Sequence, residues 1–127
     1  MAQAAVNLLH ERAKPEALKV AVLDRDHLAR MTFGDRSLER EVLQLFDRQS
    51  ELLLDRMRAS EPAAIATLAH TLKGSAVGIG ATRVASAAAE VEATAQAKPG
   101  ESSRAIDELA QAVEEARAAI SALIRAH

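Results

Sequence analysis

Apolar residues recur at helical spacing along most of the chain, and this periodicity constrains the fold more than any other feature. The segment from about residue 103 shows it most clearly, in a heptad-like series: Ile106, Leu109, Val113, Ala116, Ile120 and Leu123. Residues three or four positions apart lie on one face of an α-helix. No segment keeps the alternation of a half-buried strand, so we predict an all-α protein.

Three further long segments have the same period. They run from 35 or 37 to about 58, from 60 to 78 or 80, and from about 81 to 97. Asp24 is a candidate N-cap for a shorter helix that ends near Thr32 and buries Leu28 and Met31. We therefore predict an up-and-down four-helix bundle with an additional short N-terminal helix.

The periodicity also predicts which residues face the core. In the first long helix the apolar stripe is Leu38, Val42, Leu45, Phe46, Leu52, Leu53 and Met57. In the second it is Ile65, Leu68, Leu72, Ala76 and Ile79, and in the third Val84, Ala88, Val91 and Ala95. Ser60, followed by Glu61 and Pro62, is the expected start of the second long helix.

Length and composition bound the domain organisation and the location of the chain. The 127 residues fit one domain, which we place at 24–127; residues 1–23 form an N-terminal arm, with a short helix over 2–13 as one alternative. A net charge of −2 argues against a basic nucleic-acid-binding face. The sequence has no cysteine, which excludes a disulfide framework and thiolate chemistry. No apolar run approaches the roughly 18 residues of a membrane span, so we expect a cytoplasmic protein.

One segment, "LAHTLKGSAVGIGA" from Leu68 to Ala81, does not fit a purely structural helix. Gly74 in a helix interior costs about 1 kcal/mol relative to alanine. On a helical wheel His70 lies ~140° from the centre of the core arc. Gly74 lies opposite the core together with Ala63, Ala66, Thr67 and Val77, and Lys73 lies one turn from the histidine. We therefore expect an exposed imidazole on a face of small side chains that a partner can approach.

Three chemistries suit an exposed imidazole beside an ammonium. Metal binding needs a second ligand three or four residues away, and Ala66, Thr67, Lys73 and Gly74 are poor ligands. Acid–base catalysis lacks an evident pocket, and few polar groups converge on His70. Nucleophilic attack on phosphorus remains. The ammonium of Lys73 is placed to offset the charge of a phosphoryl group on His70.

The segment also resembles the signature of the histidine-containing phosphotransfer (HPt) domain of phosphorelay signalling. His70, Leu72, Lys73, Gly74, Ser75 and Gly80 match that pattern in order, and the similarity extends over about residues 24–125. The resemblance implies a four-helix bundle whose exposed histidine is phosphorylated on the ring nitrogen remote from the backbone. It implies a phosphocarrier without kinase activity or a cofactor of its own. The partners would be a hybrid histidine kinase and the receiver domains of response regulators, which supply the aspartate and Mg²⁺.

The resemblance also implies a partner for the imidazole. In this family the residue 22 positions after the histidine often contacts its other ring nitrogen, and here that residue is Glu92. A carboxylate there would fix the tautomer and raise the nucleophilicity of the reacting nitrogen. The alternative is a simply solvated Glu92.

Two other kinds of protein, and a second explanation of Gly74, stay open. A dimerising histidine domain of a sensor kinase usually has an acidic residue after the histidine and a proline soon after, whereas Thr71 follows His70 here. A non-catalytic helical interaction bundle explains the heptads but not Gly74. Gly74 could instead have a positive φ and end the helix early. We expect a monomer, because one bundle with one site needs no second copy.

Overall fold

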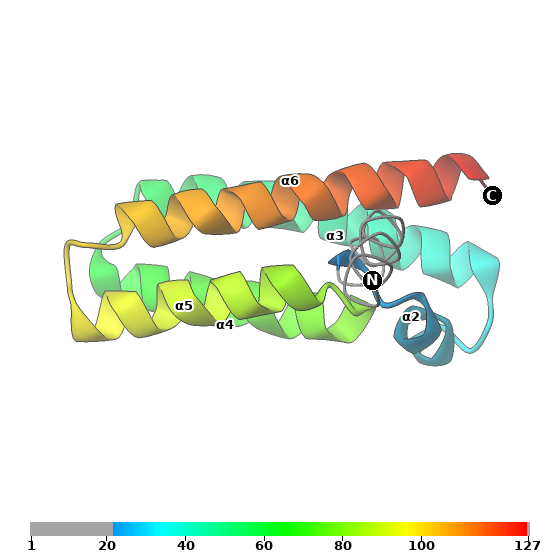
Figure 1. The fold of residues 1–127 in the computed structure, drawn as a ribbon, viewed down its shortest axis with the longest axis horizontal. Helices are drawn as coiled ribbons and strands as arrows, with labels where there is room; N and C mark the ends of the chain where they lie inside the picture. The colour runs from blue at the N-terminus through cyan, green and yellow to red at the C-terminus, as the bar shows by residue number, and fades with distance from the viewer. Residues whose placement is uncertain (1–21, 127) are drawn as a thin grey trace, which may run out of the picture.

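A computed structural model describes residues 22–126, which form five helices and no strand. The bounds are α2 Arg25–Met31, α3 Arg36–Arg58, α4 Pro62–Ile79, α5 Thr82–Ala97 and α6 Ser103–Ala126. The four long helices run up and down around one core, and α2 lies across the end of the bundle where α4 turns into α5 (Figure 1). The predicted all-α bundle with a short preceding helix is confirmed. The arm predicted over 1–23 and its helix over 2–13 lie almost wholly outside the described residues.

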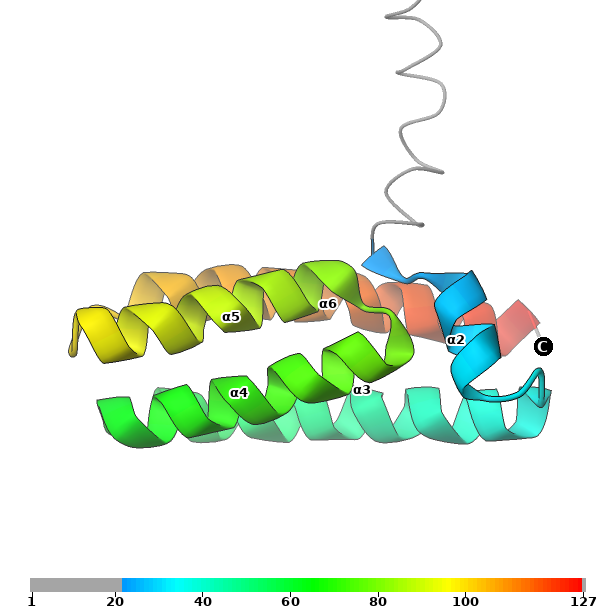
Figure 2. The same cartoon turned by 90° about the horizontal axis from the view of Figure 1, so that it is seen from below.

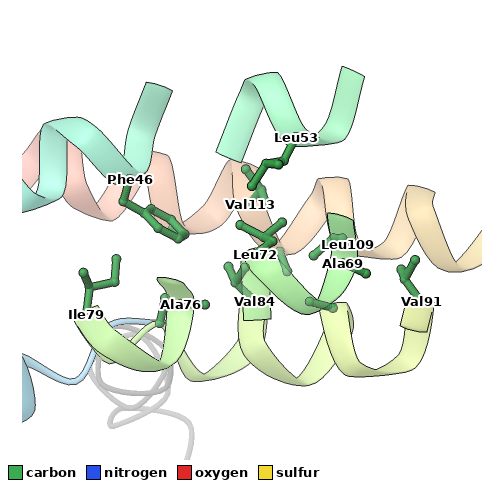
Figure 3. Packing of buried hydrophobic residues seen from close by; sticks show 14 of the residues in the cluster. Phe46, Leu53, Ala69, Leu72, Ala76, Ile79, Val84, Val91, Leu109 and Val113 are labelled. Atoms are coloured by element: carbon green, nitrogen blue, oxygen red, sulfur yellow. The ribbon is translucent and has the colours of Figure 1, made fainter. Parts of the chain in front are cut away.

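The four long helices form a square in which α4 and α6 lie at opposite corners (Figure 2). Each long helix therefore packs against two neighbours, and α4 and α5 make the most extensive contact. Alanines on α5 permit this close approach, because Ala88 is fully buried and Ala95 nearly so. Figure 3 shows the apolar side chains of the four helices meeting in the interior, with Leu72 near the centre.

The predicted core faces of α5 and α6 are confirmed at every position. The prediction for α3 was partly wrong. Leu43 is fully buried, whereas Leu45 and Leu52 are 47% and 50% exposed. The buried positions of α3 are spaced three and four residues apart: Leu43, Phe46, Ser50, Leu53 and Met57. Leu45 and Leu52 each precede a member of this line, and one residue turns the side chain by ~100°.

Two further predictions of burial were wrong, one on α2 and one on α4. Met31 is 54% exposed, because α2 is only two turns long and presents Leu28, at 1%, to the core. Ala66 was expected on the outer face with Gly74 but is buried. The buried arc of α4 is therefore wider than its largest apolar residues indicate.

The helix ends explain how α5 is placed against α4. Asp24 caps α2, as predicted, and of the two predicted starts of α3, at 35 and 37, Asp35 is the one that caps the helix. Ser60 does not cap α4; Glu61 holds that position without a side-chain hydrogen bond, and Ser60 Oγ donates to the carbonyl of Arg56 at 2.6 Å. Gly80 ends α4 in the left-handed conformation, with φ 78°.

The turn after α4 consists of residues 80 and 81 and is tied to the start of α2. The amide of Asp24 donates to the carbonyl of Gly80 at 2.8 Å.

None of the helices within residues 22–126 is both long and apolar enough to cross a membrane.

Candidate functional site

His70 lies near the middle of α4 and points away from the core. Its side chain is 67% exposed, while the neighbouring Ala69 and Leu72 are fully buried. The apolar residues on the opposite side of α4 therefore fix the helix, and the helix presents the imidazole to solvent. This orientation agrees with the helical wheel.

Glu92 reaches the imidazole from the neighbouring helix α5. His70 Nδ1 and Glu92 Oε2 are 3.1 Å apart, and the Glu92 side chain is only 20% exposed. An ionised carboxylate can only accept, so Nδ1 must carry the proton that it donates. The lone pair of the neutral ring is then on Nε2, the nitrogen remote from the backbone. The alternative of a simply solvated Glu92 is wrong.

Lys73 binds the second oxygen of the same carboxylate. Lys73 Nζ donates to Glu92 Oε1 at 3.0 Å. The hydrogen bond from Lys73 is the main reason why the pKa of Glu92 lies below its ordinary value, and the neighbouring His70 lowers that pKa further. The expectation that few polar groups converge on His70 was therefore wrong, because the missing group comes from another helix.

Gly74 leaves the space beside His70 open. It is exposed, and a Cβ added to it would meet no atom within 4 Å. Among residues 22–126 the positive φ angles belong to Phe33, Gly34, Gly80 and Gly100, so Gly74 has ordinary helical geometry. The explanation that Gly74 ends the helix early is wrong. No packing contact in the described part of the chain requires a glycine here.

An apolar groove borders this face on the side of α3. It has a volume of about 270 Å³ and lies between α2, α3 and α4, with Met31, Leu45, Gln49, Ser75 and Gly78 in its lining. Val77 lies outside this groove, on the face of α4 that carries His70 and two turns after it, and is 56% exposed. The imidazole thus has a charged pair on its α5 side and exposed apolar side chains on its α3 side.

Metal ligands do not gather around the histidine. Nowhere within residues 22–126 do three or more histidine, aspartate or glutamate side chains lie close enough to hold an ion. The chemistry that the arrangement can support is therefore that of a single exposed nitrogen nucleophile with one carboxylate and one ammonium behind it.

Several solved structures share the fold. Histidine-containing phosphotransfer protein B from Pseudomonas aeruginosa has a TM-score of 0.74 and 24% identity, covering 84% of this chain and 96% of that chain. A putative histidine-containing phosphotransfer protein from rice has a TM-score of 0.59 and 16% identity, covering 98% and 90%. No curated protein sequence matches the chain.

A sequence comparison with protein families supplies the assignment. The model of the Hpt domain family matches residues 38–119, well over half of the chain. The matched region contains all of α4 and α5, and with them His70, Lys73, Gly74 and Glu92. The chain therefore belongs to the Hpt domain family, the histidine-containing phosphotransfer domains of phosphorelay signalling.

Proposed function

We propose that His70 is the phosphoacceptor of this phosphotransfer protein. The observation that carries the proposal is the hydrogen bond from His70 Nδ1 to Glu92, because it leaves the lone pair on the exposed Nε2. Hpt domains interact with receiver domains, and they carry phosphoryl groups rather than acting as kinases. We place this monomeric chain in the cytoplasm, between two receiver domains of a relay that a hybrid histidine kinase feeds.

The transfer step needs little from the protein beyond position. The Nε2 lone pair attacks the phosphorus of a receiver aspartyl phosphate, and a P–N bond forms. The P–O bond to the aspartate breaks, and its electron pair stays on the aspartate oxygen. The receiver domain supplies Mg²⁺, and this chain uses no cofactor of its own. The same step in reverse passes the group to the aspartate of a second receiver domain.

Lys73 has a secondary role in this proposal. Lys73 Nζ is 3.0 Å from Glu92 Oε1, and the long side chain of Lys73 can turn toward a phosphoryl group on His70 Nε2. A charge-assisted hydrogen bond there would offset part of the phosphoryl charge. Removal of Lys73 should therefore slow transfer without abolishing it.

The receiver domain has a natural place to dock. We propose that it covers His70, Gly74 and Val77 on α4 and extends over the α3 side, onto Leu45 and Leu52. The side chains of Val77, Leu45 and Leu52 are each about half exposed. Partly exposed apolar side chains around a reactive group are typical of a protein-binding surface.

The His70→Gln variant tests the phosphoacceptor. His70 contributes nothing to the core, so the variant should fold normally and take up no label from a phosphorylated receiver domain. His127→Gln, which changes a histidine outside the described residues, is the matched control and should label normally. Acid-labile label on His70→Gln would refute the assignment. Label from ATP alone, without a receiver, would instead favour the kinase-domain alternative.

The Leu45→Gln variant tests the docking surface. We expect the KM for the phosphorylated receiver to rise about fivefold, the effect of losing roughly 1 kcal/mol of contact. Ala118→Gln changes an exposed position on α6 and is the control. An unchanged KM in Leu45→Gln would place the receiver elsewhere, while leaving the role of His70 intact.

A further inference from the structure

We infer that the negative charge of Glu92, beyond its hydrogen bond, keeps the phosphorylated ring of His70 protonated at Nδ1 and so makes the phosphoryl group easy to pass on. The inference rests on the proposed function, in which His70 is phosphorylated at Nε2. It concerns the protein with a phosphoryl group on His70, whereas the tautomer described above is that of the unphosphorylated ring.

The geometry gives Glu92 a strong hold on this proton. Its carboxylate oxygen is 3.1 Å from Nδ1, and its side chain is four-fifths shielded from solvent. A partly shielded pair attracts more strongly than the same pair in bulk water. Lys73 helps to keep the carboxylate ionised, since its hydrogen bond lowers the pKa of Glu92.

The proton on Nδ1 decides how easily the P–N bond breaks. When Nε2 attacks phosphorus with Nδ1 already protonated, the product ring carries a formal positive charge. When the phosphoryl group then leaves, the P–N electron pair returns to Nε2 and the ring departs as neutral imidazole. A ring that has lost the Nδ1 proton would have to depart as an imidazolate anion, which is a far poorer leaving group.

Two further charged groups lie near the phosphorylated ring, Lys73 and the phosphoryl group itself. Glu92 on α5 and Lys73 on α4 are the charged groups recorded at the ring among the described residues. A phosphoryl group on Nε2 brings about two negative charges near neutral pH. These negative charges lie next to the ring and favour its protonation, as the charge of Glu92 does.

The substitution Glu92→Gln separates the charge from the hydrogen bond. Glutamine can still accept a hydrogen bond from Nδ1, but it is neutral. The parent and the variant are loaded with phosphoramidate, a small donor that needs no receiver, and the lifetime of the phosphohistidine is measured between about pH 5 and pH 9. Lys73→Ala and the double variant Lys73→Ala/Glu92→Gln show whether any change comes from releasing Lys73 instead. Asp107→Asn, which breaks an exposed ion pair with Arg58, is the control.

We expect phosphorylated Glu92→Gln to survive about tenfold longer at neutral pH and to pass its group to a receiver about tenfold more slowly, the size of one charge-assisted contact. The pH above which hydrolysis slows should move lower by about one unit. The same differences should separate the double variant from Lys73→Ala. A lifetime and pH profile unchanged by Glu92→Gln in either background would overturn the inference alone. Failure of phosphoramidate to label His70 in the parent would overturn the proposed function as well.

Discussion

Gly74 lies inside α4, and Gly80 directly follows its last residue; the two glycines have opposite surroundings. A Cβ on Gly80 would lie 2.7 Å from the carbonyl oxygen of Asp24, and the φ of 78° is one that other residues rarely adopt. A Cβ on Gly74 would meet nothing within 4 Å, and the backbone there is ordinary helix.

The contrast separates a glycine that the fold requires from one that it does not. Gly80 allows α4 to end and the chain to pass close to α2. Gly74 weakens its helix and relieves no clash within the described residues, so nothing in the described fold requires a glycine there. Because Gly74 lies one turn from His70, the proposed function explains it as room for the receiver domain that exchanges the phosphoryl group.

The largest effect should come from filling the open side. Gly74→Gln should fold normally, because its side chain projects into solvent, but should lose about a hundredfold in the rate of transfer from a receiver domain. Labelling by phosphoramidate should persist, since a small donor needs no docking surface. Stopped-flow or gel-based transfer assays, with Ala118→Gln as control, measure the effect. A normal transfer rate in Gly74→Gln would show that access of the receiver domain to His70 does not depend on Gly74.

A smaller but still large effect should appear at the other glycine. Gly80→Ala should lower the free energy of unfolding by about 2 kcal/mol or more, because it combines a left-handed residue with a backbone clash. Gly100→Ala is the matched control, since Gly100 has φ 92° but open space around its Cβ position. Denaturant unfolding should show a greater loss for Gly80→Ala. Equal losses would mean that Asp24 moves aside easily.

The third prediction tests the cost of Gly74 directly. Gly74→Ala should raise the free energy of unfolding by up to about 1 kcal/mol and slow transfer less than Gly74→Gln does. Gly78→Ala provides the comparison, because it is another helical glycine with open space. A destabilised Gly74→Ala would show that the fold does need this glycine after all.

The smallest effect concerns the contribution of Glu92 to the stability of the fold at low pH. The pKa of Glu92 is lower in the folded protein than its ordinary value of 4.5. Its contribution to stability is therefore present above about pH 4.5 and is lost as the pH falls through the folded value. The difference in melting temperature between parent and Glu92→Gln should shrink in that acidic range. A difference that grows with acid would contradict the lowered pKa and the ion pair behind it.

Periodicity predicted α5 and α6 well because each has one apolar line without competing neighbours. It misplaced Leu45 and Leu52 because α3 carries leucines on both sides of its true line, and spacing alone does not choose between them. It placed His70 and Gly74 on the open face correctly. Glu92 could come only from the family resemblance, since no periodic pattern reports which residue of α5 lies opposite a given residue of α4.

The two-residue turn at Gly80 and Ala81 affects the distances from Glu92 to His70 and Lys73. The length of this turn sets how far α5 is shifted along α4. One residue of shift moves a helix by ~1.5 Å, about three times the 0.5 Å span of ordinary N–H···O lengths. One added or deleted residue would therefore separate Glu92 from both His70 and Lys73 while leaving each helix intact. A turn outside the proposed site thus decides whether Glu92 reaches His70.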